Sequence, residues 1–176
     1  MYSVDDLVVY GSMGVCTVTD ICVPDLPGME NQCYILKPHF VANSKVYAPV
    51  EGNPVKMRLM ITAKQAKTLI DSMPDIEVFP TDNKERQEMY NTYKSVVKSA
   101  DCFLLARLIK TLYEKKLRTL EQKKTVPSVE KELFDIAEKN LFGELAAALD
   151  MPIEEVEGYI SDRLGDSTPL MRSNAS

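Results

Sequence analysis

Residues 57–73, MRLMITAKQAKTLIDSM, mark the point where the sequence pattern changes from β-strand to α-helix. The first four, Met57 to Met60, fit a last short strand. After Ile61 the apolar residues recur at i, i+3, i+4 and i+7, and Thr62 stands just before them as a helix cap. These apolar positions are Ala66, Leu69, Ile70 and Met73. The change predicts an α+β chain with two domains, the β-module first and the helical module second.

Four short runs of apolar and β-branched residues precede this point, at residues 7–10, 15–23, 32–36 and 45–49. Segments rich in Gly, Pro and Asp separate them, as is typical of tight turns. Pro49 has no N–H for a ladder, so it must lie at a strand end or an edge. Short antiparallel strands of this kind favour a small closed or nearly closed barrel. Strict alternation in the second run places one set of side chains on one face: Val15, Thr17, Thr19, Ile21 and Val23.

Cap signals divide the second half of the chain into helices. Asp82 and Glu85 have the spacing of a capping box, Asp101 is a further N-cap, and Pro127 and Pro152 open two more helices. The helix after Asp101 is expected to bury Phe103, Leu105, Leu108, Ile109 and Leu112. We therefore predict a β-module at 1–61, a helix and Pro-rich linker at 62–81, a compact helical domain of about four to five helices at 82–165, and a flexible tail at 166–176.

Composition fits a soluble globular protein, since 45% of residues are hydrophobic and 27% are charged. No apolar run approaches the ~18 residues that span a bilayer. The first residues, Met1 to Asp6, have neither the basic nor the apolar region of a secretory signal. We expect a cytoplasmic protein without membrane contact.

Residues that carry catalysis or bind metals are sparse. The four cysteines form no CxxC pair and His39 is the single histidine, so a zinc site is not expected. The sequence contains no glycine-rich nucleotide loop, no HExxH and no GxSxG. We expect a protein that is not an enzyme and has no cofactor.

Positive charge is concentrated in one stretch although the net charge is −5. Residues 84–124 hold 11 basic and 5 acidic groups, a local net charge of +6. Such a stretch fits either a phosphate-binding surface or the solvated face of helices, and charge alone leaves both interpretations open.

Two ordered sets of residues resemble a known family. The first set is Asp6-Leu7-Val8-Val9-Tyr10, Gly14-Val15, Val18, Ile21, Gly28, Tyr34-Ile35-Leu36-Lys37 and Val46-x-x-Pro49. It resembles the polymerase-interacting domain of the CarD/CdnL family of bacterial transcription regulators, shared with transcription-repair coupling factor. The second set is Glu130-Lys131, Ala137 and Leu141-Phe142-Gly143-Glu144-Leu145-Ala146, similar to the family's late DNA-proximal helix.

The resemblance implies a Tudor-like β-barrel that docks on the RNA polymerase β subunit by pairing strand edges. Lys45, Val46 and Tyr47 fall on the strand that would face the polymerase. In actinobacterial relatives a basic side chain takes the place of Tyr47, so this contact would differ in polarity. The resemblance also implies a helical domain that meets promoter DNA near the upstream edge of the −10 element and steadies the open complex. We expect a monomer.

The DNA-facing residues depart from the family's pattern. Actinobacterial members wedge a tryptophan into the minor groove, whereas this chain has no tryptophan and aligns Arg86 at that position. Wedging requires an apolar side chain, but an arginine enters a narrow minor groove electrostatically. The candidates are Lys84, Arg86, Lys131 and Lys139. A further basic cluster comprises Lys115, Lys116, Arg118, Lys123 and Lys124.

Two other functions remain open. The helical domain is a protein adaptor if it never touches DNA. Residues 145–156 also have the pattern of a helix-turn-helix, but the would-be recognition helix begins with Glu154, Glu155 and Glu157, whose charge repels phosphates.

Overall fold

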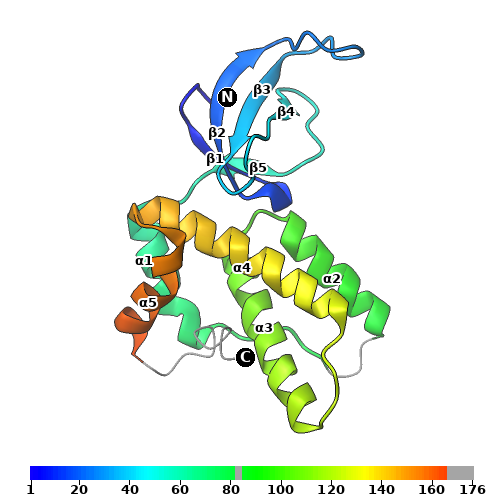
Figure 1. The fold of residues 1–176 in the computed structure, drawn as a ribbon, viewed down its shortest axis with the longest axis vertical. Coiled ribbons are helices and arrows are strands. Elements are labelled where there is room, and N and C mark those ends of the chain that lie inside the picture. The colour runs from blue at the N-terminus through cyan, green and yellow to red at the C-terminus, as the bar shows by residue number, and fades with distance from the viewer. Residues whose placement is uncertain (82–84, 166–176) are drawn as a thin grey trace.

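A computed structural model describes residues 1–81 and 85–165 of the chain. The molecule consists of a β-module at one end and a bundle of helices at the other, with the long helix α4 (Ser128–Leu149) crossing beneath the sheet (Figure 1). The α+β architecture with two parts agrees with the sequence prediction.

The β-module is a five-stranded antiparallel sheet with the order β4-β3-β2-β1-β5. Its strands are β1 (Leu7–Tyr10), β2 (Val15–Cys22), β3 (Cys33–Pro38), β4 (Val46–Pro49) and β5 (Met57–Leu59). A short 3₁₀ turn, η1 (Gly11–Met13), joins β1 to β2. The main core cluster of this module consists of Val8, Tyr10, Cys16, Val18, Tyr34, Leu36 and Ala48.

The sheet is open, which corrects the expected closed or nearly closed barrel. Among the described residues β4 and β5 do not pair with each other, and each ends the sheet as an edge. Tyr2 bridges β3 and β5 instead: its hydroxyl donates to the carbonyl of Met57 at 2.9 Å, and its ring packs edge-on against Tyr34. An aromatic side chain thus covers this side of the core, where the short edge strands do not meet.

A β-bulge interrupts the predicted alternation of β2. Val18 pairs with Leu36 but Asp20 pairs with Ile35, so Thr19 is an extra residue without a partner in the ladder. A bulge of this kind moves all later side chains to the other face. Val15 therefore packs outside the β-core, toward the helices, whereas Ile21 packs on the core. The prediction that both lie on one face is wrong.

The helical part contains α1 (Ala63–Ser72), the 3₁₀ turn η2 (Met73–Asp75), α2 (Arg86–Lys98), α3 (Cys102–Glu121), α4 and α5 (Ile153–Leu164). Thr62 forms the capping box of α1 with Gln65, and Asp101 caps α3 by accepting a hydrogen bond from the N–H of Leu104. Both predicted caps are confirmed. The N-cap of α2 is Glu85, while the predicted cap Asp82 lies outside the described residues.

Helix α1 packs into the helical core, through Ala66, Leu69 and Ile70. The Pro-rich turn after it is held by Lys110 of α3, whose buried ammonium donates to the carbonyls of Met73, Pro74 and Ile76. The segment expected to be helix plus linker therefore belongs structurally to the bundle.

Phe103 corrects the predicted core of α3. It is 46% exposed, whereas Leu105, Leu108, Ile109 and Leu112 are buried as expected. Two positions correspond to a rotation of about 200° around a helix, which turns Phe103 away from the side that buries Leu105.

Candidate functional surfaces

The strand expected to face a polymerase is an open edge. Val46 of β4 packs against the β-core, and Tyr47 is half-buried on the opposite face, where it pairs with Ile35. Lys45 is exposed just before the strand. Only β3 pairs with β4 in the described part of the chain, so the other side of β4 has no ladder partner within it.

The pairing register shows which backbone groups of β4 face outward. The N–H of Val50 donates to the carbonyl of Gln32 at 2.9 Å. Hydrogen-bonded pairs alternate with non-bonded ones in an antiparallel ladder, so Ala48 and Val46 turn their polar groups toward β3. Tyr47 then directs its N–H and C=O to the open edge. Pro49 shares this outward position, where its missing N–H leaves the internal ladder intact.

The basic candidates of the helical part lie in different surroundings. Arg86 is exposed at the start of α2, with its guanidinium carbon 5.8 Å from the centroid of the Tyr90 ring. Lys115 lies at the same distance from that ring, and its ammonium contacts the buried carboxylate of Glu130 at 2.5 Å. Lys115 therefore has its charge neutralised inside the protein, whereas Arg86 has no carboxylate partner among the described residues.

Arg86 and Lys131 belong to one neighbourhood. The hydroxyl of Tyr90, beneath Arg86, donates to Glu130 at 3.3 Å, and Lys131 is the next residue of α4 and is exposed. Lys139 lies eight residues further along α4, about 12 Å away along the helix axis. Its ammonium donates to the carbonyl of Phe40 at 3.4 Å, beside the β-module. Lys84 lies outside the described residues.

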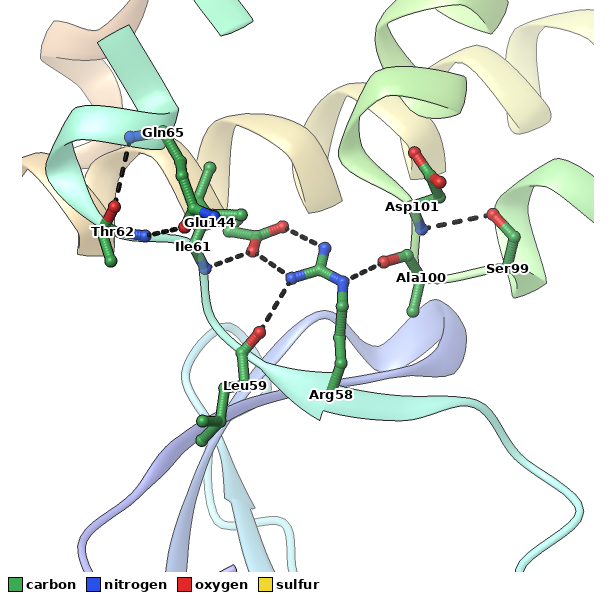
Figure 2. Close-up of polar contacts among 9 residues, drawn as sticks. All are labelled: Arg58, Leu59, Ile61, Thr62, Gln65, Ser99, Ala100, Asp101 and Glu144. Carbon is green, nitrogen blue, oxygen red and sulfur yellow. Dashed lines mark hydrogen bonds and ion pairs between the residues drawn. The ribbon is translucent and has the colours of Figure 1, made fainter. Parts of the chain in front are cut away.

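A buried ion pair connects the two modules (Figure 2). The guanidinium of Arg58 on β5 meets the carboxylate of Glu144 on α4 through two bonds of 2.6 and 2.8 Å. Arg58 also donates to the carbonyl of Ala100, at the turn between α2 and α3, at 2.5 Å. The N–H of Ile61 donates to the same carboxylate at 3.0 Å. One side chain from the sheet is thus bonded to two helical elements.

The surroundings of Arg58 favour its charged form. Burial alone would lower the pKa of the Arg58 guanidinium, but the hydrogen bonds and negative charge of Glu144 raise that pKa above its usual value. Glu144 is 1% exposed. A carboxylate buried to this degree is tolerated because the bidentate arginine and a backbone N–H satisfy its oxygens.

Close packing of α4 against the β-module adds two further contacts. A Cβ on Gly143 would overlap the ring of Phe40, so glycine lets this aromatic side chain reach the helix backbone. Asn140 donates to the carbonyl of Ser12 in η1 at 3.0 Å. Together with Glu144, these residues form the face of α4 against which the β-module packs.

Sequence reasoning missed this junction. It assigned the segment Leu141–Ala146 to a DNA-proximal helix, but all six residues are buried, and Gly143 and Glu144 contact the β-module. The available signal was a glycine and a glutamate inside an otherwise apolar helical run. Such residues indicate a close approach and a buried polar partner.

The cysteines and the single histidine lie apart from these surfaces' basic candidates in the sequence and differ in burial. All four cysteines are free, and burial raises the pKa of the Cys16 thiol to about 11. Burial and the charge of Lys37 lower the pKa of His39, whose Nε2 lies 2.8 Å from the hydroxyl of Thr17. Over residues 1–81 and 85–165 no cluster of acidic, histidine or cysteine side chains could hold a metal ion. No helix in these ranges is long and apolar enough to cross a membrane.

Comparisons with known proteins agree with this two-part architecture. Residues 2–61 match the family model described as CarD-like/TRCF RID domain, and residues 76–161 match the model described as CarD, C-terminal domain. No curated protein matches the sequence significantly. The first match covers the five strands and the second covers α2, α3, α4 and most of α5. The chain belongs to the CarD-like family and is an RNA polymerase-binding transcription factor of the CarD/CdnL type.

Proposed function

We propose that this protein docks on the RNA polymerase β subunit through the free edge of β4 and thereby holds its helical part against promoter DNA near the −10 element. In this position it lengthens the lifetime of the open complex. The observation that carries the proposal is the outward backbone of Tyr47 on an edge strand that only β3 pairs with in the described chain.

Edge pairing suits this surface physically. A strand added to an open edge gains main-chain hydrogen bonds, and the side chains that alternate along it supply specificity. Tyr47 offers a half-buried aromatic anchor, and Lys45 supplies a charge beside it. Aromatic side chains at the centre of an interface often carry a large share of the binding energy.

The DNA contact is assigned to Arg86 and Lys131, which are both exposed and linked through Tyr90 and Glu130. A protein with a net charge of −5 binds DNA weakly on its own. Docking on the polymerase raises the local concentration of promoter DNA, so a few weak phosphate contacts suffice. Lys139, which donates to Phe40, has a secondary part in this contact.

Binding to the isolated β-subunit lobe tests the docking step. Tyr47→Glu should weaken the affinity at least tenfold, because a carboxylate would be desolvated against the partner strand. Tyr47→Phe, which keeps the ring, is the matched control and should bind like wild type. If the wild-type chain does not bind the lobe, the proposed docking is wrong.

Open-complex lifetime on a promoter tests the second step. The double variant Arg86→Ala/Lys131→Ala should keep its affinity for the lobe and shorten the lifetime that wild type confers. Lifetimes identical to wild type would favour the adaptor interpretation, in which the helical part contacts protein alone.

A further inference from the structure

A cleft separates the β-module from the C-terminal half of α2. It consists of two adjoining hollows of about 470 and 350 Å³ that share Ser12 and Lys98 in their walls. The first lies between the β4–β5 loop with η1 and the end of α2, and the second continues between α2 and α4. In Figure 1 η1 stands directly above the C-terminal end of α2.

Three lysines from both modules surround this cleft. Lys56 directly precedes β5, and Lys94 and Lys98 lie one turn apart on α2. All three are exposed, and none forms an ion pair with a described residue. Glu132 is the one carboxylate in the walls of the two hollows among the described residues. The cleft therefore has an excess of positive charge without an internal partner.

Several other basic side chains, by contrast, already bind partners inside the protein. Arg58 is paired with Glu144, Lys115 is paired with Glu130, and Lys110 donates to three carbonyls. The hydroxyls of Ser12 and Ser95 are exposed beside the unpaired lysines and add neutral donors. Ammonium groups and hydroxyls are the side chains that proteins use to contact phosphate oxygens.

We propose that this cleft binds backbone phosphates of the duplex promoter DNA, bridging the two modules. The proposal rests on the function proposed above and extends its DNA contact to Lys56, Lys94 and Lys98. Among the described residues that line the cleft none is aromatic, so nothing there stacks on a nucleobase. Such a lining favours DNA, which it would contact through several phosphates, over a free nucleotide, whose base would have no stacking partner.

The length of α2 is compatible with DNA contacts at both of its ends. Arg86 and Lys98 are twelve residues apart, which is about 18 Å along the axis of a helix. Duplex DNA presents one charge per ~1.7 Å of its axis, so a segment of this length carries about ten phosphates. A DNA backbone is therefore long enough to extend from Arg86 to the cleft at the other end of α2.

The salt dependence of the equilibrium constant for polymerase–promoter binding, measured with this protein present, tests the proposal. Each phosphate contact steepens the slope of the logarithm of the DNA association constant against the logarithm of salt concentration by about 0.9. Lys94→Gln/Lys98→Gln should make the slope shallower by about 1.8, and adding Lys56→Gln should bring the change to about 2.7. Lys64→Gln/Lys67→Gln on exposed positions of α1 is the matched control and should leave the slope unchanged.

The outcomes separate this inference from the proposed function. If wild type lengthens the open-complex lifetime but the triple variant has the wild-type slope, the cleft is not a DNA site. If wild type has no effect on lifetime, the proposed function itself fails and this inference fails with it. Titration of the isolated chain with inorganic pyrophosphate supplies the third arm: saturable binding at micromolar concentration, abolished by Lys94→Gln/Lys98→Gln, would assign the cleft to a small anion and overturn the DNA proposal.

Discussion

The two edges of the sheet, β4 and β5, are similar in length but different in availability. On β5, Arg58 is bound to Glu144 and Ala100, and the carbonyl of Met57 is taken by the hydroxyl of Tyr2. On β4, no residue in the described ranges bonds to the outward backbone of Tyr47. An edge strand is open to a partner protein only where the fold has not already used its polar groups. Edge position alone therefore does not identify a docking strand.

The largest expected effect comes from detaching β5. Arg58→Ala leaves the carboxylate of Glu144 buried without its cation and should destabilise the protein by about 3 kcal/mol, at the low end for buried pairs because the Arg58 side chain is 31% exposed. Urea unfolding measures the loss. Arg163→Ala removes a cation from the pair with Asp71, whose side chain is 53% exposed, and should change stability far less. Equal losses in the two variants would mean that the junction contributes no more than a surface contact.

The second effect compares the two edges directly. Leu59 on β5 is 57% exposed, so Leu59→Glu should fold normally and bind the polymerase lobe with wild-type affinity. Tyr47→Glu should bind at least tenfold more weakly, a difference of about 1.4 kcal/mol. Surface plasmon resonance with the immobilised lobe measures both. Weakened binding by Leu59→Glu would place the docking edge on β5, or on both strands.

A smaller effect is expected where β5 leads into α1. Thr62→Ala removes the capping box with Gln65 and should cost about 1 kcal/mol of unfolding free energy. Thr68, exposed within the same helix, is the matched control, since Thr68→Ala removes no cap. A thermal unfolding midpoint that falls equally for both substitutions would contradict a special role for Thr62.

The smallest effect depends on pH. Hydrogen bonds from Arg163 hold the pKa of the Asp71 carboxyl below its usual value. The resulting stabilisation is present above the unfolded pKa of about 3.9 and disappears as the pH falls through the lower folded pKa. Asp71→Asn should therefore be slightly less stable than wild type at pH 7, and the difference should shrink as the pH falls below about 3.9, as measured by urea unfolding. A difference that stays constant as the solution is acidified would show that this ion pair is not its cause.

Local signals in the sequence predicted the elements of the fold well. The change of period after Ile61, the caps at Thr62 and Asp101 and the helix start after Pro152 depend on neighbouring residues, so they can be read along the chain. The bulge at Thr19 could not be read in this way, because the strand pattern on both sides of it remains apolar. Its position depends on the partner strand.

Long-range pairings account for most of what sequence reasoning missed at the functional surfaces. Arg58 and Glu144 are 86 residues apart, and neither belongs to a motif. The basic candidates were found by residue type, but type does not show that Lys115 is neutralised by Glu130 or that Lys139 contacts Phe40. The unpaired lysines of the cleft come from two modules and meet only in the folded chain.

The packing of the β-module against α4 has a geometric consequence. Glu144 and Gly143 are anchored to the β-module near one end of this rigid helix, and Lys131 lies thirteen residues away, about 20 Å along the axis. A difference of about 10° in the angle between α4 and the β-module would shift Lys131 by about 3.5 Å, more than the length of a hydrogen bond. The angle at this junction therefore sets the position of Lys131 relative to the β-module.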